Sequence, residues 1–164
     1  MEGNANMKGN IIEAWYDEPD EWIDINGNTV SYPGETHLYK ETKYGTFYGH
    51  VKVSDKDKDI ANAWDGYRFA EMKCDIQAYK VKANIMKERA NGITHALKVV
   101  LNGNPDLAND PVIDKLLRQE IVAWKNYYRA KEQYEVMRDS YSGFCDVVIK
   151  QRRELRNKKD ITVR

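Results

Sequence analysis

The sequence predicts an α+β protein in which a small N-terminal antiparallel β-meander precedes a long antiparallel helical hairpin with coiled-coil-like packing. Side chains alternate with period two over residues 46–53, and the spacing of apolar residues becomes helical after Ser54. Two heptad patterns then follow, separated by a short loop that contains proline. The 164 residues are enough for one domain with its own core.

The N-terminal third carries the strand signals. Residues 1–10 are rich in Asn and Gly and are expected to form a flexible tail, whereas residues 11–53 form the meander. Asn26-Gly27 lies between two β-rich runs, which is the pattern of a hairpin turn. In the last run, one face is expected to carry Phe47, Val51 and Val53 and the other Tyr48, His50 and Lys52.

Residues 54–157 are expected to form the helical hairpin, with helices over about 55–101 and 111–157 and a basic tail over 158–164. Ser54 begins a capping-box pattern, and Asp110-Pro111 is a second helix start. The first apolar seam contains Ile60, Tyr67, Cys74 and Val81, with Trp64 on its flank. The second seam contains Ile113, Tyr127, Tyr134, Tyr141, Val148 and Leu155.

A second apolar stripe lies on the first half of the later helix. It consists of Leu117, Ile121, Trp124 and Tyr128. One partner helix cannot cover both stripes, so the meander or a second subunit is needed. A homodimer formed through the helices is therefore one expectation.

The net charge of zero conceals a gradient along the chain. Residues 1–55 carry ten acids and four lysines, which gives −6, and residues 150–164 carry seven bases and two acids, which gives +5. The basic end either contacts nucleic acid or an acidic protein, or simply complements the negative end of a helix dipole. Both interpretations remain open from the sequence.

Composition limits the class of protein. The apolar runs are too short for a membrane-spanning helix, and the first ten residues lack the layout of a signal peptide. Two cysteines cannot build a disulfide scaffold, which is typical of a reducing compartment. A cytoplasmic protein with no membrane partner is expected.

Metal-binding motifs are not recognisable. Asp55, Asp57 and Asp59 alternate as in a calcium loop, but Ile60 stands where the turning glycine is needed, so helix capping explains the acids better. The three histidines, His37, His50 and His95, are far apart in the sequence, and the two cysteines fall on separate helices. We therefore expect no metal and no cofactor.

Catalytic motifs are equally unrecognisable, since nucleophile-elbow, Walker and dinucleotide-binding patterns are missing from the sequence. Glu35 and His37 lie on the same side of a predicted strand and could act as an acid–base pair, but such pairs arise by chance. A hydrolase would need acids and histidines to converge. We assign no catalytic residue and expect a non-enzyme.

The leading hypothesis is a non-enzymatic interaction module that binds a protein partner through the hairpin and the sheet, as adaptors, assembly components, stoichiometric inhibitors and phage accessory proteins do. The alternative is nucleic-acid binding through tyrosines and lysines of the sheet and the basic C-terminal segment. The candidate binding residues are Lys40, Lys43, Tyr44, Tyr48, His50, Lys52, Lys150, Arg152, Arg153, Arg156, Lys158 and Lys159.

Overall fold

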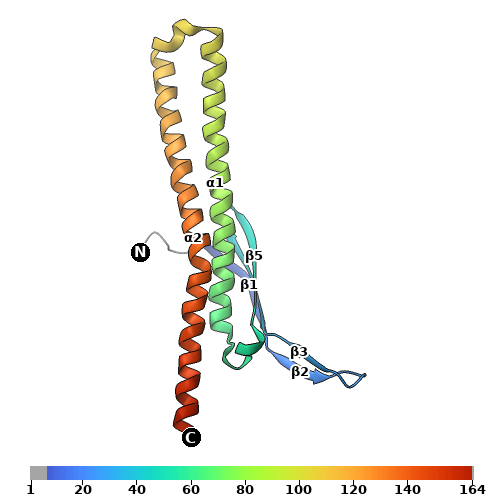
Figure 1. Cartoon of the computed structure of the whole chain (residues 1–164). Coiled ribbons are helices and arrows are strands. Elements are labelled where there is room, and N and C mark those ends of the chain that lie inside the picture. The colour runs from blue at the N-terminus through green and yellow to red at the C-terminus, as the bar shows by residue number, and fades with distance from the viewer. Residues whose placement is uncertain (1–6, 164) are drawn as a thin grey trace. The chain divides into compact units, whose positions relative to one another are not determined.

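The computed structural model describes residues 7–163 and confirms the expected fold class: antiparallel strands at the N-terminal end precede two long helices that pack together (Figure 1). The strands are β1 (Gly9–Asp17), β2 (Asp20–Ile23), β3 (Thr29–Tyr32), β4 (Glu35–Thr42) and β5 (Gly45–Lys52). The helices are the short 3-10 turns η2 (Asp55–Ile60) and η3 (Pro105–Asn109) and the long α1 (Ala63–Gly103) and α2 (Pro111–Val163). Within the described residues, none of the helices is apolar over a length that could cross a membrane.

The strands form two separate antiparallel sheets. In the larger sheet the strand order is β1-β4-β5. The strands β2 and β3, which lie between β1 and β4 in the sequence, form a separate two-stranded ribbon. The ribbon's turn is closed by Asp24, whose carboxylate accepts hydrogen bonds from the backbone N–H groups of Asn26 and Asn28, and Gly27 adopts a positive φ of 82°. The turn predicted at Asn26-Gly27 is therefore confirmed.

The first long helix begins later than expected. It starts at Ala63 instead of about residue 55, because residues 55–60 form the 3-10 turn η2. Within the described part of the chain, the Ser54 side chain makes no capping hydrogen bond. Asn62 acts as the cap instead: its Oδ1 accepts the backbone N–H of Asp65 at 2.9 Å.

The start of α2 agrees with the prediction, since Pro111 is its first residue and the Asp110 carboxylate accepts the backbone N–H of Val112 at 2.8 Å. The expected tails differ from the structure. Strand β1 already includes residues 9 and 10, whereas residues 1–6 of the expected tail lie outside the described residues. Helix α2 continues to Val163, so residues 158–163 of the expected basic tail are helical, and Arg164 is not described.

The chain divides into two compact units. One contains Tyr79–Val136 of the hairpin, and the other contains the strands, η2 and the remaining parts of both long helices, up to Ala78 and from Met137. In the first unit, Trp124 Nε1 donates to Thr94 Oγ1 at 3.0 Å, and that hydroxyl is also hydrogen-bonded to Glu120. These contacts join α1 to α2 there.

In the unit that contains the sheet, one face of the sheet packs on α1. Leu38 of β4 and Ala70 and Cys74 of α1 are fully buried and form the core, with Phe47, Val51 and Tyr67 packed against them. The Cys74 thiol lies 3.6 Å from the carbonyl oxygen of Leu38, so this part of the predicted first seam faces the sheet. Phe69 makes the contact to α2, where its ring meets Phe144 edge to face.

Two apolar residues of the predicted seams are exposed instead. Trp64 is 68% exposed at the start of α1, and Leu155 is 51% exposed near the end of α2. At these two positions the apolar pattern therefore extends further than the buried contact.

Candidate functional site: the outer sheet face

The strand register places a group of aromatic, histidine and acidic side chains on the face of the three-stranded sheet that is turned away from α1. Residues at alternate positions of a strand share a face, and directly paired residues of neighbouring strands share it too. We call this surface the outer sheet face. Its members are Glu13, Trp15 and Asp17 of β1, Glu35, His37, Tyr39 and Glu41 of β4, and Thr46, Tyr48, His50 and Lys52 of β5.

The rings on the outer sheet face stack in a row across the three strands. Trp15 stacks on His37 with ring centroids 4.7 Å apart, and His37 stacks on His50 at the same distance. Tyr39 packs against Tyr48 with centroids 4.9 Å apart. The phenol oxygen of Tyr48 is also hydrogen-bonded to Nδ1 of His37. This contact fixes the position of the His37 ring from a neighbouring strand.

Glu35 is the electrostatic centre of this face. One of its carboxylate oxygens lies 3.4 Å from Nε2 of His37 and 3.3 Å from Nε2 of His50, and the other lies 3.5 Å from the Lys52 ammonium. Partial burial opposes ionisation of Glu35, but the neighbouring His50, Tyr32 and Lys52 groups outweigh it and hold its pKa below the usual value. Glu35 is therefore a carboxylate at neutral pH.

Asp17 adds a second carboxylate to this cluster. Its Oδ2 lies 3.4 Å from Nε2 of His37. Glu35, His37 and His50 each offer one ligand atom, and these three atoms lie within 4.8 Å of one another. These are the residues of the face that could hold a metal ion.

The candidate residues predicted on the sheet separate into three places. Tyr48, His50 and Lys52 lie on the outer sheet face, as the alternation predicted. Lys43 and Tyr44 lie in the β4–β5 turn, where the Lys43 ammonium is 5.2 Å from the centre of the Tyr44 ring.

Lys40 is not on a binding surface, and its prediction as a binding residue is wrong. Its side chain is 2% exposed and faces α1, where its ammonium lies 2.8 Å from Asp75 and 2.7 Å from Glu71. Burial alone would favour the neutral amine, but hydrogen bonds to the two carboxylates outweigh it and raise the pKa of Lys40. The charge of the Lys40 ammonium is therefore paired with carboxylates of α1 inside the fold.

The three arginines predicted as binding residues in the basic C-terminal segment are paired with acids of η2 and the start of α1. Arg152 binds Asp65, Arg153 binds Asp57 and Arg156 binds Asp59, with closest N···O distances of 2.8, 2.7 and 3.0 Å. Lys150, Lys158 and Lys159 are exposed on α2. Two aspartates of the Asp-x-Asp-x-Asp sequence, Asp57 and Asp59, therefore bind arginines distant in the sequence, in addition to the capping role that we expected. The side chain of Asp55 lies outside the described residues.

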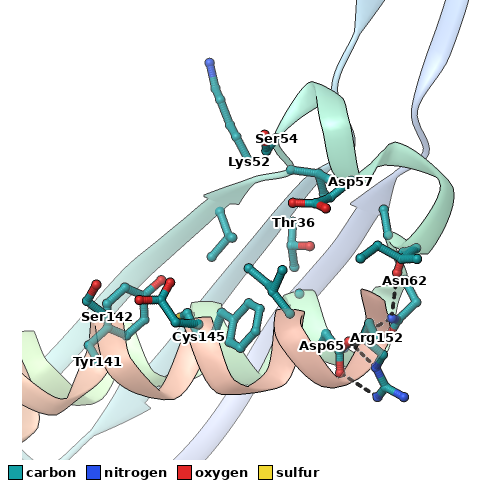
Figure 2. Close-up of a pocket in the computed structure, with 18 of the residues that line it drawn as sticks. Thr36, Lys52, Ser54, Asp57, Asn62, Asp65, Tyr141, Ser142, Cys145 and Arg152 are labelled. Carbon is teal, nitrogen blue, oxygen red and sulfur yellow. Dashed lines mark hydrogen bonds and ion pairs between the residues drawn. The ribbon is translucent and has the colours of Figure 1, made fainter. Parts of the chain in front are cut away.

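A cavity of about 350 Å³ lies between β5, η2 and the adjoining parts of α1 and α2. Figure 2 shows Tyr141, Ser142 and Cys145 towards one end of this cavity, and Asn62, Asp65 and Arg152, which bind one another, at the other. Burial raises the pKa of the Cys145 thiol, so it is a poor nucleophile at neutral pH.

Sequence reasoning missed the convergence of His37 and His50. Although they are distant in the sequence, the two residues are directly paired across β4 and β5. The β4–β5 turn was recognisable, and pairing Thr42 with Gly45 across it places His37 opposite His50 and Glu35 opposite Lys52. Trp15 had no comparable signal, because the pairing of β1 with β4 spans the inserted ribbon.

The chain was compared with protein families, with curated proteins and with solved structures, and none of the three comparisons gave a match.

Proposed function

We propose that the protein is a non-enzymatic interaction module whose outer sheet face binds a positively charged segment of a partner protein. The observation that carries this proposal is the combination of charge and aromatic rings on that face. Four carboxylates and one lysine give the face a net charge of −3 when its histidines are neutral. These charged residues are Glu13, Asp17, Glu35, Glu41 and Lys52.

The aromatic rings supply the second half of the recognition. Tyr39 and Tyr48 are 37% and 39% exposed, so their ring faces are accessible to a ligand. A lysine or arginine of a partner gains about 0.5–1 kcal/mol over an exposed aromatic ring and more where water is excluded. Acids beside such rings favour cationic side chains over phosphate groups.

The β2–β3 ribbon supports a protein partner in addition. Trp22, Ile23 and Ile25 are 47%, 72% and 99% exposed on it. Neighbouring exposed apolar residues are typical of protein contact surfaces. A partner held on the outer sheet face through charge would gain apolar contact area from such a ribbon.

The positions of the basic residues favour this proposal over the nucleic-acid alternative. Arg152, Arg153 and Arg156 are already bound to aspartates, and Lys40 is buried. Phosphate binding depends on cations that neutralise the nucleic-acid backbone. Four of the nine cations predicted for that purpose are therefore engaged within the fold, and a fifth, Lys52, lies beside Glu35.

The proposal covers adaptors, assembly components and stoichiometric inhibitors, including accessory proteins of phages, because proteins of these classes bind their partners through an exposed surface. Action in the cytoplasm belongs to the same proposal. It is supported by the cysteines, since both Cys74 and Cys145 are free thiols.

The test is a binding measurement with fluorescent peptides. Lysine- and arginine-rich peptides, acidic peptides of equal length and single-stranded oligonucleotides are titrated with the intact chain by fluorescence anisotropy. We expect the basic peptides to bind, a Tyr39→Ala/Tyr48→Ala variant to lose at least tenfold in affinity, and Tyr128→Ala, which removes an exposed tyrosine from α2, to bind like the wild type.

Preferential binding of oligonucleotides, or basic-peptide affinity that is unchanged in the double variant, would overturn the proposal. Mass spectrometry of the recovered peptide separates binding from catalysis. An intact peptide agrees with a non-enzyme, whereas cleavage that depends on Glu35 would point to a hydrolase.

A further inference from the structure

We propose that Glu35, His37 and His50, with Asp17 as a fourth ligand, bind one divalent transition-metal ion of the zinc class. This inference does not rest on the proposed partner, because the ion would bind the isolated chain. It assigns a second activity to the central part of the outer sheet face.

The spacing of the ligand atoms carries the inference. A tetrahedral zinc ion bonds nitrogen and oxygen ligands at about 2.0–2.2 Å, which separates neighbouring ligand atoms by roughly 3.3–3.5 Å. The Glu35 carboxylate oxygen lies 3.4 Å from Nε2 of His37 and 3.3 Å from Nε2 of His50. The Asp17 oxygen lies 3.4 Å from the same nitrogen of His37. Each of these three separations is close to one edge of such a tetrahedron. Asp17 lies outside the group of ligand atoms that are all within 4.8 Å of one another, so its side chain has to approach the ion to become the fourth ligand.

The donor set selects the class of metal. Two imidazole nitrogens and two carboxylate oxygens suit zinc, cobalt or nickel, whereas calcium and magnesium prefer a shell made of oxygen atoms alone. The two carboxylates also balance the charge of a divalent cation. Lys52, 3.5 Å from the second oxygen of Glu35, leaves the first oxygen to face the histidines.

The surroundings of His37 prepare it as a ligand. Its Nδ1 is hydrogen-bonded to the Tyr48 hydroxyl and its ring stacks on Trp15, so that Nε2 is directed towards Glu35 and Asp17. With Nδ1 as the N–H donor to that hydroxyl, Nε2 carries the free lone pair. Metal-bound histidines are commonly oriented through the second ring nitrogen in this way.

His50 is the ligand that must move. The two imidazole planes differ by only 18°, and an ion has to lie in the plane of both rings, so one ring must turn. Nε2 of His50 is buried and makes no hydrogen bond within the described residues, although Glu35 is 3.3 Å away. Turning this ring towards an ion exchanges the 3.3 Å contact with Glu35 and the stacking on His37 for a bond to the ion, and it provides a partner for a buried nitrogen.

The experiment titrates the untagged full chain with Zn²⁺ by isothermal calorimetry and with Co²⁺ by visible absorption. We expect one ion per chain and an affinity lowered by about tenfold or more in His37→Gln, His50→Gln and Glu35→Gln. His95→Gln is the matched control, because His95 is an exposed histidine of α1 and should leave binding unchanged. Cys145→Ser should also leave the Co²⁺ spectrum unchanged.

Far-ultraviolet circular dichroism of every variant establishes that it is folded. Absence of Zn²⁺ binding to the folded wild type at millimolar concentration would overturn the inference. Full affinity in a folded His37→Gln/His50→Gln double variant would do the same, as would loss of binding in His95→Gln. Retained peptide binding together with absent metal binding would refute the metal site alone and leave the proposed function standing.

Discussion

Arg153 and Asp57 are 96 residues apart in the sequence and form a two-pronged ion pair, with N···O distances of 2.8 and 2.7 Å. Arg152 forms the same arrangement with Asp65 at 2.8 and 2.9 Å. Asp57 and Asp65 are buried, so these pairs are better shielded from solvent than ordinary surface ion pairs. They fasten the last part of α2 to η2 and the start of α1.

The pairing predicts how stability depends on acid. Hydrogen bonds from Arg153 and Arg152 outweigh the effect of burial and lower the pKa of Asp57 and of Asp65 below 3.8. In the folded state these groups bind protons less readily than in the unfolded chain, so their stabilisation is present above about pH 4 and is lost as pH falls further. The Tm of wild type should therefore exceed that of Asp57→Asn at pH 6, and the difference should shrink towards pH 3. A difference that stays constant down to pH 3 would contradict the stabilising role of this ion pair.

Lys40→Met tests the buried charge on the other face of the sheet. The change leaves the carboxylate of Asp75, which is fully buried, without its closest cation, and breaking a buried pair costs about 3–5 kcal/mol. Burial already raises the pKa of Asp75 to about 6 from 3.8, and loss of Lys40 raises it further. The folded variant then binds a proton more readily than the unfolded chain, so its urea-unfolding free energy should recover as pH falls from 8 to 5.

Lys43→Met, which removes an exposed lysine from the adjacent turn, is the control for Lys40→Met and should change the unfolding free energy by less than about 0.5 kcal/mol. If Lys40→Met were equally harmless at pH 8, the buried pairing with Asp75 would be refuted.

Gly49→Ala tests the close packing of β5 on α1. A Cβ at Gly49 would clash with the carbonyl oxygen of Ala70 and lie 3.1 Å from the Cys74 sulfur, so strand and helix must separate. We expect a loss of about 1–3 kcal/mol in urea unfolding. Gly143→Ala is the opposite control, because its Cβ has open space on a helix and should gain about 0.5–1 kcal/mol. Equal effects of the two changes would contradict this packing.

The apolar stripe of α2 makes a prediction about assembly. In the single chain, three residues of the stripe are exposed by 37%, 57% and 59%, namely Leu117, Ile121 and Tyr128. The apolar surface that we expected a second subunit to cover is therefore open to solvent. Sedimentation velocity should show a concentration-dependent dimer that Ile121→Glu abolishes, whereas Val147→Glu, at another exposed position of α2, leaves it intact. A chain that stays monomeric at all concentrations would contradict the expected homodimer.

The elements were predictable where their signals are local. The Asn26-Gly27 turn and the Asp110-Pro111 helix start depend on residues within a few positions of one another, and the structure has both. Ser54 shows the limit of such signals. It has a capping-box pattern, but the chain forms a 3-10 turn first, and Asn62 caps the long helix.

The outer sheet face was only half predictable. The alternation in β5 correctly placed Tyr48 and His50 together, but their neighbours come from other strands. Lys40 has the same parity as Leu38, which already indicates an inward position, yet a buried lysine is credible only when its partner Asp75 on α1 is known. Likewise, only the folded chain brings Arg153 to Asp57.

The most direct test of the central claim is a chemical-shift map of the binding surface. The ¹⁵N-labelled full chain is titrated with the tightest-binding lysine- or arginine-rich peptide, and backbone amide shifts are followed residue by residue. If the outer sheet face is the binding site, the largest shifts will fall in β1, β4 and β5 around Trp15, Tyr39 and Tyr48. Shifts concentrated instead in residues 150–159 or along the apolar stripe of α2 would contradict the account.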